Sequence, residues 1–385
     1  MMNNKLISFI RDAYQTSDFI PLHKPTFVGN EKAYVMNTID STFVSSVGKY
    51  VEDFEKHIES YTGTAKAVAT VNGTAALHAA LYMAGVKAGD LVITQALTFV
   101  ATCNALYHMG AEPIFIDVSK VSLGLCPRSV EEYLQGNAKL NAEGECVHKS
   151  TGQRIKALVP MHTFGHPVDL DELIIICLKW NLVLVEDAAE SLGSFYKGKH
   201  TGVFGDFSAL SFNGNKIITT GGGGMVLCKS IDAGLHTKHI TTTAKEPHKW
   251  DYTHDMVGYN YRMPNLNAAL GCAQMERLPS VLADKHELAE AYVSYFSTTH
   301  YQPIVELAGN RSNYWLNAIL CVDLNQRDAL LEAGRSKGVQ LRPIWQLMPD
   351  SQPYGKALCA PIPVARDVAS RLVNLPSSCR LMPDA

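Results

Sequence analysis

Short apolar runs alternate with longer segments of helical character between about residues 50 and 230. Apolar runs bounded by turn residues predict buried strands, and Ala- and Leu-rich segments between them predict helices. This alternation is typical of an α/β protein with a mainly parallel sheet. Representative strands are predicted at Ala65–Thr70, Leu91–Thr94, Glu112–Ile116, Ala157–Pro160 and Leu182–Glu186. A helix is predicted over Thr74–Ala84, ending at Gly85.

A different organisation is expected toward the C-terminus. Residues 266–296 have one long helical pattern, which Pro279 is predicted to interrupt or restart. We interpret this stretch as the bridge between a large domain, residues 1–275, and a smaller C-terminal α+β domain, residues 276–385. The smaller domain is predicted to contain strands at Asn317–Val322 and Val339–Pro343 and a helix at Arg327–Lys337.

Two segments are predicted to lack regular structure. The chain after Met348 is rich in Pro and Ser, which predicts a loop-rich tail. The polar segment 134–154 is predicted to be a solvated excursion.

Composition and charge exclude several classes of protein. The chain has 385 residues, of which 46% are hydrophobic and 18% charged, as expected of a folded protein with a large core. The net charge is −3 and no long run of Lys or Arg occurs, so we expect no nucleic-acid or membrane partner. The N-terminus does not resemble a signal peptide, and no apolar run approaches the roughly 18 residues of a membrane span. Nine scattered cysteines without a C-x-x-C pair favour reduced thiols in the cytoplasm.

The most informative stretch is residues 183–227, which places acids, a Ser, a Lys and four glycines close together. Glu186 and Asp187 end a predicted buried strand, and open α/β sheets bind ligands at the carboxyl ends of their strands. Lys216 follows Ser211 by five residues and precedes the run Gly221–Gly224. A lysine in such a turn can be partly desolvated, which favours the neutral amine that forms an imine. A single lysine of this kind is more often an exposed loop residue, so the neighbouring residues decide the interpretation.

Further candidate residues lie at two other strand exits. Asn72-Gly73-Thr74-Ala75 precedes an Ala-rich helix, whose first amides and the Thr74 hydroxyl can hold a phosphate. An ordinary helix cap by Asn72 or Thr74 explains the same residues equally well. Phe99 follows the next strand, where it either stacks on a heteroaromatic ring or belongs to the core.

Other ligand classes have little support. The glycine run is not G-x-G-x-x-G, which argues against a dinucleotide-binding Rossmann site. His162 and His166 have no third ligand at a recognisable spacing, so no metal site is expected.

Seven motifs in the same order closely resemble the DegT/StrS class of fold-type I pyridoxal-5'-phosphate (PLP) enzymes, the nucleotide-sugar aminotransferases. They are NGTAAL, TFVAT, PMHTFGHP, VEDAAE, SFNGNK, TTGGGGM and GYNYRMPNLNAALG. The resemblance extends from about residue 20 to 380 and implies a mainly parallel seven-stranded sheet in the large domain. Segments such as FIPLHKPTFVGNEKAYV and RPIW are similar to the branch that serves legionaminic-acid-type sugar pathways.

The resemblance implies a role for each matching residue in cofactor binding. Lys216 corresponds to the Schiff-base lysine, which also shuttles protons, and Asp187 to the partner of the pyridinium nitrogen. Phe99 corresponds to the aromatic residue that stacks on the ring. The predicted phosphate contacts are Gly73, Thr74, Ala75 and Ser211. Glu190 corresponds to a position near the cofactor's 3'-oxygen that other members often fill with Gln or His.

The resemblance also implies contacts to the substrate and to a second subunit. Asn260 corresponds to a residue that reaches the phosphate of the neighbouring subunit, which predicts a homodimer with shared active sites. Arg262 is a candidate for binding substrate or donor anions. Phe164, His166, Trp315 and Trp345 are candidates either for lining the sugar pocket or for packing.

The predicted reaction is a transfer of an amino group from L-glutamate to C4 of a nucleotide-linked 4-keto-6-deoxy sugar, with UDP and an N-acetylated hexose as the expected carrier and sugar. The pathway expected is that of a bacterial surface polysaccharide or nonulosonic acid. One alternative is a PLP-dependent sugar dehydratase of the same class, in which the lysine is typically replaced by His. Another is a non-catalytic PLP-binding regulatory protein. Lys216 favours the aminotransferase.

Overall fold

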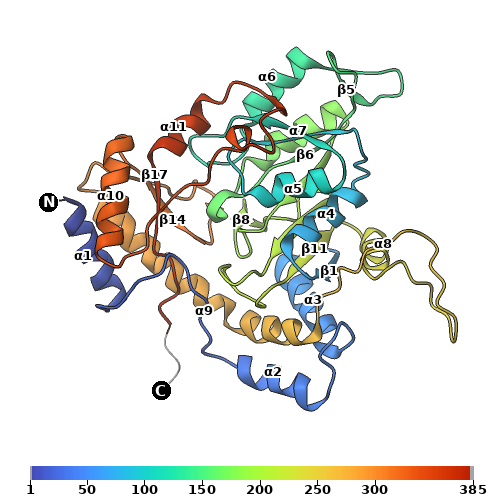
Figure 1. Cartoon of the computed structure of the whole chain (residues 1–385), viewed down its shortest axis with the longest axis horizontal. Coiled ribbons are helices and arrows are strands. Elements are labelled where there is room, and N and C mark those ends of the chain that lie inside the picture. The colour runs from blue at the N-terminus through green and yellow to red at the C-terminus, as the bar shows by residue number, and fades with distance from the viewer. Residues whose placement is uncertain (1, 382–385) are drawn as a thin grey trace.

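A large sheet forms the centre of the molecule in a computed structural model that describes residues 2–381 (Figure 1). Its eight strands in the described residues have the order β1-β11-β10-β7-β6-β2-β3-β16. The five pairs from β10 to β16 are parallel, and β11 runs antiparallel to both of its neighbours. The bounds are β1 (Lys66–Thr70), β2 (Leu91–Gln95), β3 (Glu112–Ile116), β6 (Ile155–Val159), β7 (Val183–Asp187), β10 (Phe207–Ser211), β11 (Gly224–Cys228) and β16 (Leu358–Cys359).

Helices cover both faces of this sheet (Figure 1). On one face, Val92 and Val185 pack with the Ala-rich α4, and on the other Ile93 and Leu184 pack against α7. Burial on both faces explains why the strands are continuous apolar runs without alternating polar residues. The bounds of these helices are α3 (Lys49–Thr62), α4 (Gly73–Met83), α5 (Val100–His108), α6 (Pro127–Asn137), α7 (Leu170–Trp180) and α8 (Ile231–Thr241).

A second, four-stranded antiparallel sheet with the order β12-β14-β17-β15 lies in the C-terminal part of the chain. Its core includes Ile319 and Val373, and Leu6 and Ile10 of α1 belong to the same cluster. The N-terminal helix therefore packs with the C-terminal sheet. The elements are α1 (Met2–Tyr14), β12 (Gln302–Pro303), β14 (Asn317–Leu320), α10 (Leu324–Ser336), β15 (Arg342–Pro343), α11 (Pro363–Arg371) and β17 (Leu372–Leu375).

The remaining elements connect or flank these two sheets. Helix α9 (Asn265–Phe296) runs beneath both parts of the molecule, and α2 (Glu31–Asp40) lies beside it (Figure 1). No helix of residues 2–381 is long and apolar enough to cross a membrane. The short elements are β4 (Ala138–Leu140), β5 (Cys146–His148), η1 (Thr163–Gly165), β8 (Phe195–Tyr196), β9 (Lys199–His200), β13 (Asn310–Arg311) and η2 (Met348–Asp350).

The five predicted strands and the helix at Thr74–Ala84 are confirmed to within two residues at each end. The prediction that Pro279 interrupts the long helix was wrong, because α9 continues through it. Burial of Leu278, Val281 and Leu282 around the proline outweighs the loss of one backbone hydrogen bond.

The structure refines three further expectations. The tail after Met348 has long loops, as predicted, but it also supplies α11, β16 and β17, and β17 is an inner strand of the small sheet. Residues 134–154 are mostly exposed, as predicted, but they contain the hairpin β4–β5, whose Cys146 is buried. The sheet of the large domain gains β16 as an eighth strand, contributed from the C-terminal part of the chain. The division at residue 275 stays a prediction.

Candidate active site

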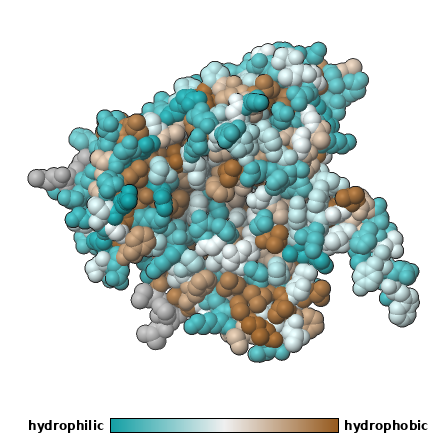
Figure 2. All heavy atoms as spheres, in the orientation of Figure 1, coloured by the Kyte–Doolittle hydropathy of each residue, from teal (hydrophilic) through white to brown (hydrophobic). Residues whose placement is uncertain are grey.

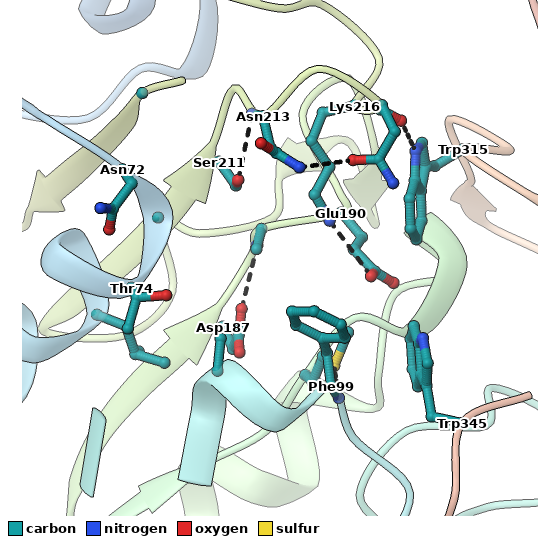
Figure 3. A pocket seen from close by; sticks show the side chains of 17 residues that line it. Asn72, Thr74, Phe99, Asp187, Glu190, Ser211, Asn213, Lys216, Trp315 and Trp345 are labelled. Atoms are coloured by element: carbon teal, nitrogen blue, oxygen red, sulfur yellow. Dashed lines mark hydrogen bonds and ion pairs between the residues drawn. The ribbon is translucent and has the colours of Figure 1, made fainter. Parts of the chain in front are cut away.

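A cavity of about 280 Å³ lies at the carboxyl ends of β7 and β10, beside the first turn of α4 (Figure 3). This is the edge at which an open parallel sheet binds ligands. Its lining residues are Asn72, Gly73, Thr74, Leu77, Phe99, Ala101, Met161, Asp187, Ala189, Glu190, Ser211, Asn213, Asn215, Lys216, Gly223, Trp315 and Trp345. The cavity therefore brings together residues from seven separate parts of the sequence.

One end of the cavity is formed by the start of α4. Asn72 caps the helix, and its Oδ1 accepts the Ala75 amide at 2.8 Å. A Cβ added at Gly73 would lie 2.8 Å from Cβ of Ser211, so glycine lets the start of α4 pack directly against Ser211. The hydroxyls of Thr74 and Ser211 lie at this end (Figure 3). A helix N-terminus with two hydroxyls beside it can hold a phosphate.

Asp187 lies at the last position of β7 and is 4% exposed. Its Oδ2 accepts the Thr102 hydroxyl at 2.7 Å, and its Oδ1 accepts the Ala189 amide at 3.2 Å. Burial raises the pKa of this carboxyl, against the lowering effects of these bonds and of Lys216. A buried carboxylate of this kind is well suited to hold a positive charge inside the cavity.

Lys216 projects into the cavity from the turn after β10, and its side chain is 12% exposed. Its Nζ lies 3.3 Å from Oε1 of Glu190 and 4.1 Å from the ring centroid of Trp315. Burial raises the pKa of Glu190 to about 7, although the charge of Lys216 acts in the opposite direction. The lysine and this acid thus form a coupled pair.

Phe99 immediately precedes α5 and is 45% exposed, which is high for an apolar side chain beside a buried strand. Its ring contacts Trp345 edge-on, with 5.8 Å between centroids. Figure 3 shows the ring on the same side of the cavity as Asp187. Phe99 is therefore not a core residue and is available to stack on a planar ligand.

These residues fit pyridoxal phosphate. The start of α4 with Thr74 and Ser211 would hold the phosphate, Phe99 would cover the ring, Asp187 would face the ring nitrogen, and Lys216 would supply the amine.

Four of the predicted site residues lie outside the lining of this cavity. Ala75 is buried in the first turn of α4, and its amide donates to the Asn72 cap. Asn260 accepts a hydrogen bond from Arg262 at 3.0 Å, and both lie on the segment that pairs with residues near β1 and α8. His166 is buried and contacts Tyr314 edge-on, and within residues 2–381 neither ring nitrogen has a hydrogen-bond partner. Their predicted roles stay predictions.

Sequence reasoning missed part of the lining. Asn213 and Asn215 flank the turn before Lys216, and Met161 and Leu77 complete the walls. The two asparagines stand within the SFNGNK motif, so their position beside the lysine was the available signal. Phe164 is buried and does not line the cavity, whereas Trp345 does.

Glu186 was predicted to emerge at the strand end with access to a ligand, and this was wrong. Its carboxylate is fully buried on the opposite face of β7. It binds His162 Nε2 at 2.9 Å and accepts the amides of Gly202, Phe204 and Gly205 at 2.7 to 2.8 Å. His162 is thereby assigned to a structural pair. Residues 2–381 contain no group of three or more His, Cys, Asp or Glu side chains arranged to hold a metal ion.

Comparisons with known proteins agree with this geometry. The model of the DegT/DnrJ/EryC1/StrS aminotransferase family matches residues 25–385. GDP-perosamine synthase of Escherichia coli O157:H7 is 35% identical over 363 residues, covering 93% of each chain. The aminotransferase EpsN of Bacillus subtilis (strain 168) is 32% identical over 378 residues, covering 95% of this chain and 92% of its own. The crystal structure of the aminotransferase TlmJ from Streptoalloteichus hindustanus superposes with a TM-score of 0.85 at 25% identity, covering 94% of this chain and 95% of its own.

Proposed function

Because the chain belongs to the DegT/DnrJ/EryC1/StrS aminotransferase family and is a PLP-dependent transaminase, we propose that it moves an amino group from L-glutamate to C4 of a GDP-linked 4-keto-6-deoxy sugar. The observation that carries this proposal is the placement of Lys216 and Asp187 in one cavity whose far end is the start of α4. A reactive amine, a buried carboxylate and a phosphate-binding helix end are the groups that amine transfer with this cofactor requires.

The cofactor, when bound, supplies an electron sink for the carbon that loses or gains a proton. Nζ of Lys216 takes that proton and returns it on the other side of the reaction, as a general base and then a general acid. The Asp187 carboxylate holds a proton on the ring nitrogen by its charge. Thr74 and Ser211 fix the phosphate, while Phe99 and Trp315 keep water away from the reacting carbon.

GDP takes the place of the UDP expected from the sequence. Relatives from Escherichia coli and Vibrio cholerae, each 35% identical to this chain, are named GDP-perosamine synthase, and that name specifies an amino sugar carried by GDP. The relatives do not support a UDP-linked N-acetylated hexose or the legionaminic-acid branch. A role in the synthesis of surface polysaccharides remains part of the proposal.

The test supplies PLP-loaded enzyme with ¹⁵N-labelled L-glutamate and either a GDP-linked 4-keto-6-deoxy sugar or a UDP-linked N-acetylated one, and mass spectrometry follows the label. The account predicts ¹⁵N in the GDP-linked sugar, a lower kcat/KM for the UDP-linked sugar, and no label with Lys216→Ala. A higher kcat/KM for the UDP-linked sugar would overturn the choice of nucleotide. Formation of a sugar that has lost a hydroxyl and carries no ¹⁵N would instead indicate the dehydratase.

We further propose that the enzyme is a homodimer whose subunits share their active sites. Large apolar side chains are exposed around α2, including Met36, Ile39, Phe43 and Val47 (Figure 2). Trp250, Tyr252 and Val257 are 74 to 82% exposed on the segment that extends beyond α8 (Figure 1). Apolar surface of this extent is typical of a protein–protein interface.

Mixed dimers of Lys216→Ala and Asn260→Ala subunits test this sharing. If Asn260 acts on the neighbouring subunit, one of the two sites in each mixed dimer contains both native residues, so mixing two weakly active proteins restores activity. If Asn260 acts within its own subunit, both sites of the mixed dimer are defective and mixing restores nothing. Light scattering of each preparation confirms the mass of the dimer.

A further inference from the structure

The nitrogen of Lys216 lies near two groups of different chemistry, a carboxylate and an indole ring, which form two walls of the cavity around it. On one side Oε1 of Glu190 is 3.3 Å away, and on the other the indole ring of Trp315 has its centroid 4.1 Å away. The side chain of Glu190 is 1% exposed and that of Lys216 is 12% exposed, so water screens their attraction weakly. A carboxylate and an aromatic face both favour a positively charged amine.

The carboxylate of Glu190 is held in this orientation by the backbone. Its Oε2 accepts the amide of Phe164 at 2.9 Å, which leaves Oε1 directed at Lys216. Phe164 has φ +57°, a left-handed conformation that is unfavourable for a residue with a side chain. The turn is therefore kept strained in a form that presents this amide to Glu190.

Asn313 fixes the two walls relative to each other. Its Nδ2 donates to the carbonyls of Glu190 and Leu192, each at 2.8 Å, and its Oδ1 accepts the amide of Trp315 at 2.8 Å. The ring of Trp315 is also fixed, because its Nε1 donates to the carbonyl of Asn215 at 2.6 Å. A fully buried amide thus ties the loop after β7 to the segment before β14.

We propose that Glu190 is the counter-ion of the Lys216 nitrogen, and that with the ring of Trp315 it stabilises and positions the protonated form of this nitrogen, including the ammonium that forms each time the free lysine takes up a proton. This role rests on Lys216 being the residue that carries PLP. It makes Glu190 and Trp315 positioning residues that act on the reaction through the protonation and the location of Lys216.

The other charged groups around this pair do not replace Glu190. Among residues 2–381, Glu190 is the acidic side chain that forms an ion pair with Lys216. Burial raises the pKa of Asp187 although the charge of Lys216 acts to lower it; its donors are the Thr102 hydroxyl and the Ala189 amide, and among residues 2–381 it forms no ion pair with the lysine. Behind the cavity, burial and Lys285 keep the pKa of His23 low, so His23 adds no positive charge near neutral pH.

The visible absorption band of the PLP-loaded enzyme reports whether the Lys216 nitrogen is protonated, and its pH titration needs no substrate. A carboxylate at this distance raises the pKa of that nitrogen, so Glu190→Gln lowers the pKa of the band by about 1 or more. Glu190→Asp keeps the negative charge, so its band pKa is expected to lie between that of Glu190→Gln and that of wild type. A band pKa in Glu190→Gln equal to that of wild type overturns the proposal.

Glu55 offers a matched control. It is also a buried carboxylate that binds a backbone amide, that of Ala69, and a lysine, Lys238, but it lies outside the cavity. Glu55→Gln is expected to leave the band pKa unchanged. If Glu55→Gln lowers it as much as Glu190→Gln does, the effect is a general consequence of removing a buried acid, and the proposal fails.

A second readout uses the enzyme stripped of cofactor. Capture of added PLP requires the neutral amine of Lys216, so the pH midpoint of the capture rate follows the pKa of this amine. The midpoint is expected to fall in Glu190→Gln and, by a smaller amount, in Trp315→Leu. If Glu190→Gln does not fold, Trp315→Leu provides the test. An unchanged midpoint in that variant contradicts the proposed stabilisation of the protonated Lys216 nitrogen.

Discussion

Glu186 and Asp187 are adjacent on β7, yet their surroundings have little in common. Glu186 has four donors around its carboxylate and is fully buried. Asp187 has two donors and lines a cavity. Successive side chains of a strand point to opposite faces, so one residue of separation places the two acids in different environments.

The comparison shows how to separate a structural acid from a functional one. The pKa of Glu186 is lowered: burial acts against the charge, but the hydrogen bonds from His162 and the backbone amides outweigh it. Burial raises the pKa of Asp187, and its protein partners do not compensate. An acid whose charge the protein alone stabilises supports the fold. An acid whose charge is not stabilised in this way is a candidate for binding a positively charged ligand.

The largest effect is expected for Glu186→Gln. The NH₂ group of the glutamine side chain would face buried backbone N–H groups that now donate to the carboxylate. We therefore predict a loss of about 3–5 kcal/mol in the free energy of unfolding. The molecules that remain folded should still bind PLP with the wild-type absorption band. Urea unfolding measures the first and a cofactor titration the second. If this variant is as stable as wild type, Glu186 is not a structural acid and the contrast with Asp187 fails.

The same site predicts a pH dependence of stability. Because the folded-state pKa of Glu186 is lowered, its contribution is present above the unfolded value of about 4.3 and is lost as pH falls through the folded value. Wild type should therefore lose stability in acid more steeply than Glu186→Gln does. Parallel curves of the free energy of unfolding against pH would contradict this origin of the stability.

Asp187→Asn is expected to have the opposite effects, a large loss of activity and a small change in stability. Loss of the charge facing the ring nitrogen should slow amine uptake from L-glutamate by about 10²–10³-fold. Stability should change little, since the amide keeps an oxygen for the Thr102 hydroxyl. Stopped-flow absorbance and thermal unfolding of the same sample separate the two effects. A variant that is unstable but as fast as wild type would reverse the roles of the two acids.

The smallest effect is expected on the neighbouring strand β10, where Ser208 lies beside Glu186 and Ser211 lies at the cavity. Ser208 pairs in register with Glu186 and donates to the carbonyl of Gly202, while Ser211 lines the cavity. Ser211→Ala should weaken PLP binding by about tenfold, the loss of one hydrogen bond to a charged group. Ser208→Ala is the matched control and should lower stability by about 1 kcal/mol without changing PLP affinity.

The sequence was sufficient for much of the fold and the site. Continuous apolar runs located the strands, and strand exits located Asp187 and Phe99, because these signals are local. The directions of Glu186 and Asp187 were not predictable, since a strand buried on both faces has no polar alternation to orient it. The three amide donors to Glu186 come from a loop 16 to 19 residues later, and His162 lies 24 residues earlier.

Contacts between distant segments account for the rest. Trp315 lines the cavity and Asn313 bonds the backbone of Glu190, both from the segment before β14, more than 100 residues after β7 and β10. No local pattern specifies such a meeting. The continuation of α9 through Pro279 likewise depends on packing along the helix, which outweighs the local preference.

The central claim is that the cavity is an aminotransferase site in which Lys216 moves the proton. The most direct measurement is the visible absorbance of PLP-loaded wild type and Lys216→Ala after addition of L-glutamate, before any sugar is present. The account predicts that glutamate removes the visible band of wild type and that the variant reacts slower by on the order of 10³-fold. Equal rates in the two proteins would contradict it.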